Sequence, residues 1–165
     1  LSEEGYLRVI RSKTAKLFEA SARLAALLAQ SSPSVEQHCA DYGQALGTAF
    51  QVIDDVLDYD GEVLEMGKNL GDDLREGKVT LPLIIAMQRG TDAERATIRQ
   101  AIENGDTADM AQIIAIVQQT GAMQATRDAA AAEAQRALDA LQTFPQNPYS
   151  DALKQLASQL LARRS

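Results

Sequence analysis

The sequence is poor in the residues that mark several common classes of protein. Its 165 residues include one cysteine, one histidine and no tryptophan, and aromatic residues make up 4%. A single cysteine, Cys39, excludes an internal disulfide framework and fits a reducing compartment. Only 4 prolines interrupt the chain, whose β-branched runs are short. This composition favours helices over sheets.

Excess positive charge and long apolar runs are missing as well. The net charge is −7 with no block of lysine or arginine, which argues against a nucleic-acid partner. The longest apolar run, Leu81–Met87, is too short to span a bilayer, and Leu1–Glu4 lacks the features of a signal peptide. We therefore expect a soluble, cytoplasmic protein with no membrane span. Because the chain starts without Met in the lead-in to a long helix, we expect the later part of a longer protein.

Helix signals follow one another along the whole chain. Apolar residues make up 45% of a length that suits one domain. Ser34 with Gln37, and Thr91 with Glu94, are predicted capping boxes at two helix starts. The sequence thus predicts one all-α domain over residues 1–165, with a charged loop at 60–78. The expected helices cover about residues 3–30, 34–59, 82–90, 91–104, 108–120, 122–142 and 150–164.

Three acids, Asp54, Asp55 and Asp58, lie at the end of the second expected helix. Like charges four residues apart destabilise a helix, and most acidic runs are solvated faces. Apolar residues flank these acids on most sides, which predicts a buried turn in which the carboxylates need a cation. Gly43 and Gly47, one turn apart on this helix, would let another backbone approach closely. The apolar neighbours are Phe50, Val52, Ile53, Val56 and Leu57.

The ligand types narrow the choice of cation. Carboxylates without histidine or cysteine favour Mg²⁺ or Ca²⁺ over zinc. An EF-hand aligned on Gly61 fails, because Val56 would be its first ligand and Gly67 its bidentate glutamate. A di-iron bundle fails because the only histidine, His38, follows Val35 rather than a glutamate by three residues. Mg²⁺ shared between carboxylates and substrate phosphates fits best.

A lysine falls on the predicted apolar stripe of the first helix. Lys13 either extends its amine outward to water or points into a polar pocket that holds phosphate, and the sequence leaves both open. Thr14 beside it could donate a hydroxyl. The loop adds Lys68 and Lys78, which alone indicate only a charged surface. The stripe consists of Tyr6, Ile10, Leu17, Leu24 and Leu28.

Three segments taken together, Ser12–Ala15, Gly47–Tyr59 and Gly67–Leu83, resemble the trans-isoprenyl diphosphate synthases, in particular the long-chain bacterial type. The match covers essentially the whole chain. The pattern Phe-Gln-x-x-Asp-Asp-x-x-Asp at residues 50–58 resembles the family's second aspartate-rich motif. The first such motif and the basic residues for isopentenyl diphosphate belong to the family's N-terminal half, and neither is present. The resemblance implies that this chain holds half of an active site.

The resemblance also implies a fold and a set of roles. The fold would be a partial antiparallel helical bundle of the isoprenoid synthase type, from a protein that is usually a homodimer. Asp54, Asp55 and Asp58 would bind Mg²⁺ facing the allylic diphosphate, and Asp73 would orient the lysine-rich loop. Asp54, Asp55 and Lys13 would then be the catalytic residues. The residues implied to hold the diphosphate or its metals are Lys13, Thr14, Gln51, Lys68 and Lys78.

The implied activity is the condensation of an allylic diphosphate with isopentenyl diphosphate, which releases diphosphate and yields a longer trans-polyprenyl diphosphate. We expect the segment alone to be inactive. An alternative is a non-catalytic partner subunit of a heteromeric synthase, but such a subunit would be free to lose the acids and lysines that are intact here. A purely structural helical bundle would leave the acids and Lys13 unexplained.

Overall fold

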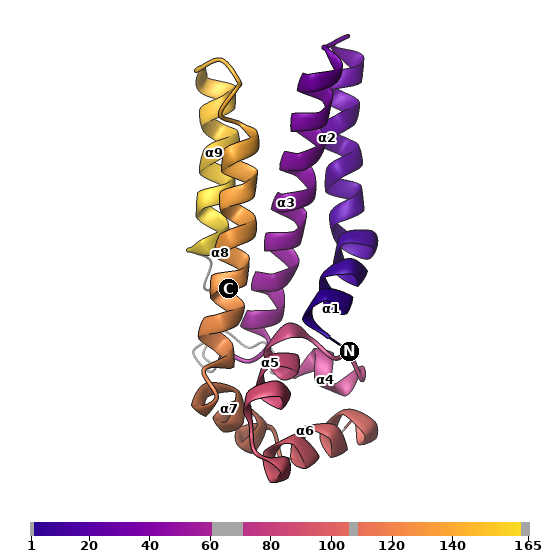
Figure 1. Cartoon of the computed structure of the whole chain (residues 1–165), viewed down its shortest axis with the longest axis vertical. Helices are drawn as coiled ribbons and strands as arrows, with labels where there is room; N and C mark the ends of the chain where they lie inside the picture. Colours follow the sequence, from indigo (N-terminus) through magenta and orange to yellow (C-terminus); the bar gives the residue numbers. More distant parts are fainter. Residues whose placement is uncertain (1, 61–70, 106–108, 163–165) are drawn as a thin grey trace. The chain divides into compact units, whose positions relative to one another are not determined.

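The computed structural model describes residues 2–60, 71–105 and 109–162, without the side chain of Asp72. Every regular element in these ranges is helical, as predicted (Figure 1). Short connections separate most elements, and the first two α-helices are joined by a π-helical segment. The elements are α1 (Glu3–Ile10), η1 (Arg11–Ala15, π-helical), α2 (Lys16–Leu28), α3 (Pro33–Leu57), α4 (Asp72–Arg75), α5 (Leu81–Arg89), α6 (Asp92–Asn104), α7 (Met110–Gln119), α8 (Ala122–Ala140) and α9 (Pro148–Leu161).

The start of α3 differs from the prediction. The capping box of Ser34 and Gln37 is wrong, because α3 already begins at Pro33. The hydroxyl of Ser32 instead accepts a hydrogen bond of 3.4 Å from the backbone N–H of Val35. The reason is the proline: its fixed φ and missing N–H suit the first helical position, so the residue before it caps the helix.

The middle of the chain contains one predicted helix start and one helix that was not predicted. The capping box of Thr91 and Glu94 is confirmed, with both reciprocal hydrogen bonds formed, and Gly105 ends α6 in the left-handed conformation at φ 60°. The prediction of a loop throughout residues 60–78 is wrong over Asp72–Arg75, where α4 forms. A single helical turn among charged residues is too short to show the periodic apolar pattern from which a helix is predicted.

The chain divides into two compact units, each of which brings together segments far apart in the sequence. Unit 1 comprises residues 1–6, 54–128 and 164–165, and unit 2 comprises residues 7–53 and 129–163. In unit 1, α5, α6 and α7 contact one another and bury side chains such as Leu83, Ile98 and Ile113. In unit 2, Tyr42 of α3 packs in a buried cluster with Leu141, just beyond α8, and with small side chains of α8 and α9.

The π-helical segment η1 changes which face of the first helical stretch is buried. Tyr6 and Ile10 are buried as predicted, but Leu17 and Leu28 are 73% and 78% exposed, so the predicted stripe is wrong beyond Ile10. A π turn inserts one residue, which rotates everything after it by about 100°. The buried positions of the later part are accordingly Ala15, Glu19 and Ala26.

The two glycines of α3 lie against the first helical stretch, as their spacing predicted. A Cβ atom on Gly43 would lie 2.8 Å from the carbonyl carbon of Phe18, and one on Gly47 would lie 2.8 Å from Cα of Ala15. Both distances are too short for carbon atoms that are not bonded, and both neighbours are backbone. The absence of a side chain at these two positions therefore permits this helix pair to pack.

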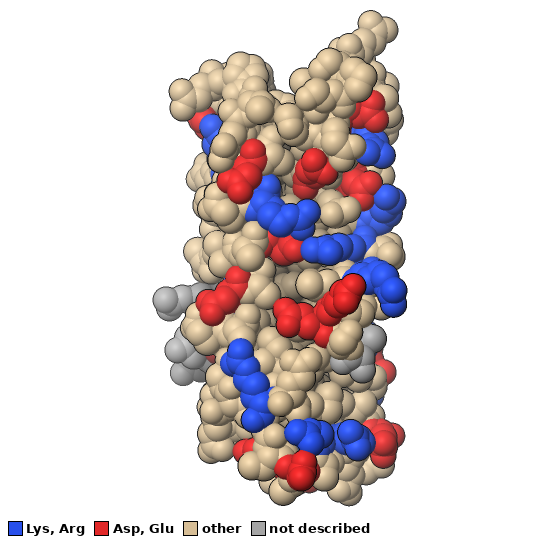
Figure 2. All heavy atoms as spheres, viewed as in Figure 1, with Lys and Arg blue, Asp and Glu red and all other residues tan. Residues whose placement is uncertain are grey.

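The surface carries charges of both signs. On the face shown in Figure 2, acidic and basic side chains lie next to one another in each unit, rather than separating into large patches of one sign. Among the described residues, no helix is long and apolar enough to cross a membrane.

Gly43→Ala should lower the stability of the full-length gene product by about 1–3 kcal/mol, the usual range for overpacking. Helix propensity alone predicts the opposite sign, a gain of about 1 kcal/mol. Urea unfolding measures the difference in free energy of unfolding. Ser21→Ala, at an exposed position of α2, is the control, because it also raises helix propensity but causes no steric clash. A Gly43→Ala protein as stable as wild type would show that the close backbone contact is not required.

Candidate active site

The three acids at the end of α3 have three different environments. Asp55 is buried, with 2% exposure, Asp54 is exposed, and Asp58 is half-buried just beyond the last helical residue. The prediction of a buried acidic turn is therefore wrong for Asp54 and only partly right for Asp58. The apolar neighbours Val52 and Val56 are buried on the side of the helix roughly opposite Asp54, which is exposed to solvent.

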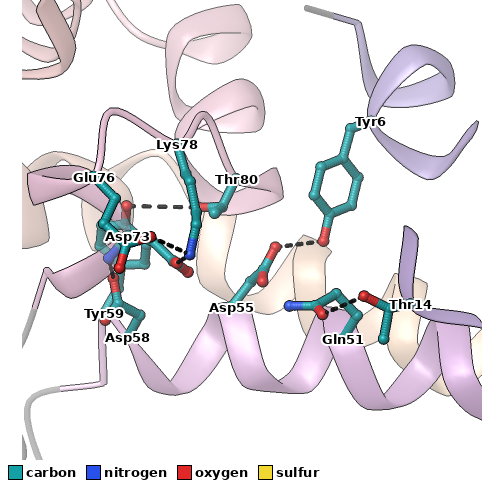
Figure 3. Close-up of polar contacts among 10 residues, drawn as sticks. All are labelled: Tyr6, Thr14, Gln51, Asp55, Asp58, Tyr59, Asp73, Glu76, Lys78 and Thr80. Atoms are coloured by element: carbon teal, nitrogen blue, oxygen red, sulfur yellow. Dashed lines mark hydrogen bonds and ion pairs between the residues drawn. The ribbon is translucent and has the colours of Figure 1, made fainter. Parts of the chain in front are cut away.

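Asp55 accepts a hydrogen bond from the hydroxyl of Tyr6 inside unit 1 (Figure 3). Tyr6 is itself buried. Burial, and next the negative charge of Asp55, raise the pKa of Tyr6 well above its usual value, so the hydroxyl keeps its proton and remains a donor. A buried carboxylate is thus stabilised by a protein donor, and its burial alone does not require a metal ion.

Asp58 connects α3 to the short helix α4. Its carboxylate accepts a hydrogen bond of 3.2 Å from the backbone N–H of Asp73, and its backbone carbonyl accepts one of 3.2 Å from Gly71. The side chain of Asp73 in turn lies 2.9 Å from the amine of Lys78, which also contacts Glu76 at 2.7 Å (Figure 3). These bonds, first that to Glu76, raise the pKa of Lys78, which is therefore a firmly held cation beside the acids.

In unit 2, the hydroxyl of Thr14 donates a hydrogen bond of 2.9 Å to the amide oxygen of Gln51 (Figure 3). The family resemblance implies that both residues hold the diphosphate or its metals, and the contact links η1 to α3. Lys13 also lies in η1, but it is exposed, so the prediction that it sits on a buried apolar stripe is wrong. The inserted π residue is the reason. Lys13 borders an open groove that is also lined by Arg8, Val9 and Ser12.

The predicted metal ligands supply hard oxygen donors. No group of three or more His, Cys, Asp or Glu side chains in the described part of the chain is arranged to hold a metal ion. Mg²⁺ in proteins is commonly bound by one or two carboxylates, with waters and substrate phosphates completing its shell. An exposed Asp54 and a half-buried Asp58 fit a metal of that kind, and they do not fit a closed all-protein cage. Lys68, the remaining predicted contact, lies outside the described residues.

Comparison with known proteins identifies the relatives of this chain. The sequence model of the family described as "Polyprenyl synthetase" matches residues 1–120. The chain belongs to the polyprenyl synthetase family. It is 47% identical over 158 residues to octaprenyl diphosphate synthase of Escherichia coli (strain K12), which covers 95% of this chain and 49% of that protein. It is 43% identical over 162 residues to all-trans-nonaprenyl-diphosphate synthase (geranyl-diphosphate specific) of Rhodobacter capsulatus, covering 98% of this chain and 50% of that protein.

Solved structures of polyprenyl synthases also match the fold of this chain. A polyprenyl synthase from Caulobacter crescentus CB15, complexed with calcium and isoprenyl diphosphate, is 41% identical with a TM-score of 0.91, covering 100% of this chain and 51% of that one. The all-α isoprenoid synthase fold is therefore confirmed. The chain spans about half the length of the relatives it matches.

Sequence reasoning missed the polar role of Tyr6, which had been assigned only to the apolar stripe. A tyrosine on a buried stripe needs a partner for its hydroxyl, and that requirement was an available signal. It also missed Arg127 of α8, whose guanidinium lies 2.6 Å from Asp60 and holds the segment after α3. No local pattern connects two residues this far apart in the sequence.

Tyr6→Phe should lower the free energy of unfolding of the full-length gene product by about 1.5–3 kcal/mol, because a buried carboxylate loses a donor. Urea unfolding at neutral pH measures the change. Tyr149→Phe is the matched control, since Tyr149 on α9 is 82% exposed. Equal unfolding midpoints for the two variants would show that the hydroxyl of Tyr6 contributes nothing to holding Asp55.

Proposed function

We propose that this chain is the C-terminal part of a single polyprenyl synthase domain, and that the full-length gene product condenses an allylic diphosphate with isopentenyl diphosphate. The observation that carries the proposal is the acidic end of α3. One acid, Asp54, is exposed, while Asp55 accepts a hydrogen bond from Tyr6 and Asp58 accepts one from the backbone of Asp73. The names of the relatives, octaprenyl and nonaprenyl diphosphate synthases, support the same chemistry.

In this proposal Asp54, Asp55 and Asp58 hold Mg²⁺, with Asp54 the most accessible. Bound Mg²⁺ would neutralise negative charge on the diphosphate that departs. Carboxylate ligands suit Mg²⁺ and Ca²⁺ alike, and a relative was solved with calcium and isoprenyl diphosphate. The hydrogen bond from Tyr6 orients Asp55 within the protein, which would reduce the rearrangement needed on binding.

Direct cations complete the proposed contacts to diphosphate. Lys13 is exposed on η1, beside Thr14, whose hydroxyl is oriented by Gln51. Lys78 is kept protonated and in place by two carboxylates. We include Lys68 on the strength of the family motif alone. Ammonium groups and hydroxyls of this kind stabilise phosphate oxygens by charge-assisted hydrogen bonds.

The proposed reaction balances without any redox partner. The bond between C1 of the allylic chain and its diphosphate oxygen breaks, and the electron pair leaves with diphosphate. The double bond of isopentenyl diphosphate forms the new carbon–carbon bond, and loss of a proton restores a double bond. Lys13, Lys78 and the acids that hold Mg²⁺ act on the departing diphosphate, where negative charge grows.

Three further features belong to the proposal. We expect a homodimer, as the family resemblance implies, and a cytoplasmic protein, as the composition suggests. The heteromeric partner subunit is the less supported alternative, because the relatives above 40% identity bear the names of synthases. We also infer that the 165-residue chain alone is inactive, since it spans about half the length of its relatives and lacks the first aspartate-rich motif.

Asp54→Ala in the full-length gene product should lower turnover by about a hundredfold or more, the range for losing one preorganised electrostatic contact to a transition state. The assay follows incorporation of isopentenyl diphosphate into product, with and without EDTA. Asp41→Ala, at a half-buried acid of the same helix, is the control and should retain turnover.

Wild-type turnover in Asp54→Ala, or full activity in EDTA, would contradict the proposed role of the acids. The same assay on the 165-residue chain alone should give no product. Clear condensation by that chain would instead refute the claim that it carries half of a site.

A further inference from the structure

A buried carboxylate outside the acidic motif connects η1 to α8 within unit 2. Glu133 is 7% exposed and binds two arginines, one through each oxygen. Its Oε1 lies 2.7 Å from Nη2 of Arg11, and its Oε2 lies 2.6 Å from Nη1 of Arg136. Arg136 is on the same helix as Glu133, three residues later, whereas Arg11 is the first residue of η1. Only the bond to Arg11 therefore ties two segments together.

The π-helical segment needs such ties. A π-helix is rare and appears mostly as a single turn inside an α-helix, so we expect contacts that favour it here. Among the described residues, polar contacts from both ends of this segment hold η1: Arg11 at its first residue binds Glu133 of α8, and Thr14 binds Gln51 of α3. Lys13 lies between these two contacts in the sequence. A return of η1 to regular α-helix would shift the register by one residue and rotate one side of η1 relative to the other by about 100°.

We propose that Arg11 and Glu133 are a positioning pair, which holds η1 in the register that presents Lys13 and Thr14 to a diphosphate. The inference rests on the proposed function, which assigns those two residues to the diphosphate. Neither member of the pair touches the ligand. Their effect is transmitted through the backbone of η1, so it depends in part on Lys13 being present.

The cluster contains its own control. Arg136 binds the same carboxylate from within α8, so removing it disturbs the charge balance of Glu133 but leaves η1 tied. If the cluster served only to stabilise α8, Arg11→Met and Arg136→Met would have similar consequences. If it positions η1, only Arg11→Met affects diphosphate binding.

The test is titration calorimetry of inorganic diphosphate with Mg²⁺ into the full-length gene product. Arg11→Met and Glu133→Gln should each weaken binding about tenfold, and Arg136→Met should change it by less than about twofold. Lys13→Met should also weaken binding. In a Lys13→Met background, adding Arg11→Met should cause a smaller further loss than it does in the wild-type protein, because the pair can then act only through Thr14.

Two results would overturn the inference: binding by Arg11→Met equal to that of Arg136→Met, or losses from Lys13→Met and Arg11→Met that simply add. If Arg11→Met does not fold, the same comparison in the wild-type and Lys13→Met backgrounds can be made with Glu133→Gln and with Arg11→Lys, which keeps the charge. Wild-type affinity in Lys13→Met would have a different meaning. It would remove Lys13 from the proposed site, whereas loss in Lys13→Met with normal binding in Arg11→Met would refute the positioning pair alone.

Discussion

The close contact between η1–α2 and α3 is the constraint on which the arrangement in unit 2 depends. At Gly47 the backbone of η1 lies so near α3 that a single added carbon would meet Cα of Ala15 at 2.8 Å. Gln51 follows one turn later on α3, where it receives the hydroxyl of Thr14. The backbone contact, the π register and the side-chain contact are therefore mutually dependent: displacing η1 from Gly47 would also separate Thr14 from Gln51.

The three aspartates at the end of α3 differ in burial and in hydrogen-bond partners, although they are close together in the sequence. Asp55 is buried under a tyrosine whose raised pKa keeps it a hydrogen-bond donor, and Asp58 caps the short helix α4. Asp54 is exposed to solvent. Two of the three carboxylates thus contribute to local structure through hydrogen bonds within the protein. The third acid, Asp54, is exposed and is therefore the most accessible to a cation.

Much of the helical framework follows from local sequence. Capping residues such as Thr91, glycine stops such as Gly105 and the first-turn proline of α5 locate helix ends, because they act within one turn. Periodicity failed at η1, because one inserted residue leaves the composition unchanged while rotating Leu17 to the surface. The burial of the acids could not be predicted either. Whether Asp54 faces solvent depends on which segments pack against α3, and that is decided by contacts distant in sequence.

The candidate site was predicted unevenly for the same reason. Its motif residues were identifiable because their order along the chain resembles a family. The contact between two of them, Thr14 and Gln51, was not predicted and is seen only in the structure. Tyr6, Arg11 and Glu133 lie outside those motifs, and their roles emerge only when helices far apart in sequence meet.

The most direct test of the central claim is the dependence of diphosphate binding on Mg²⁺. Inorganic diphosphate should bind the full-length gene product at least about tenfold more tightly with Mg²⁺ than with EDTA. The reason is that the positive charge of Mg²⁺ offsets the repulsion between the carboxylates and the diphosphate. Asp54→Asn should remove most of that difference while preserving the fold. Equal diphosphate affinity with Mg²⁺ and with EDTA, in the wild-type protein, would contradict the account.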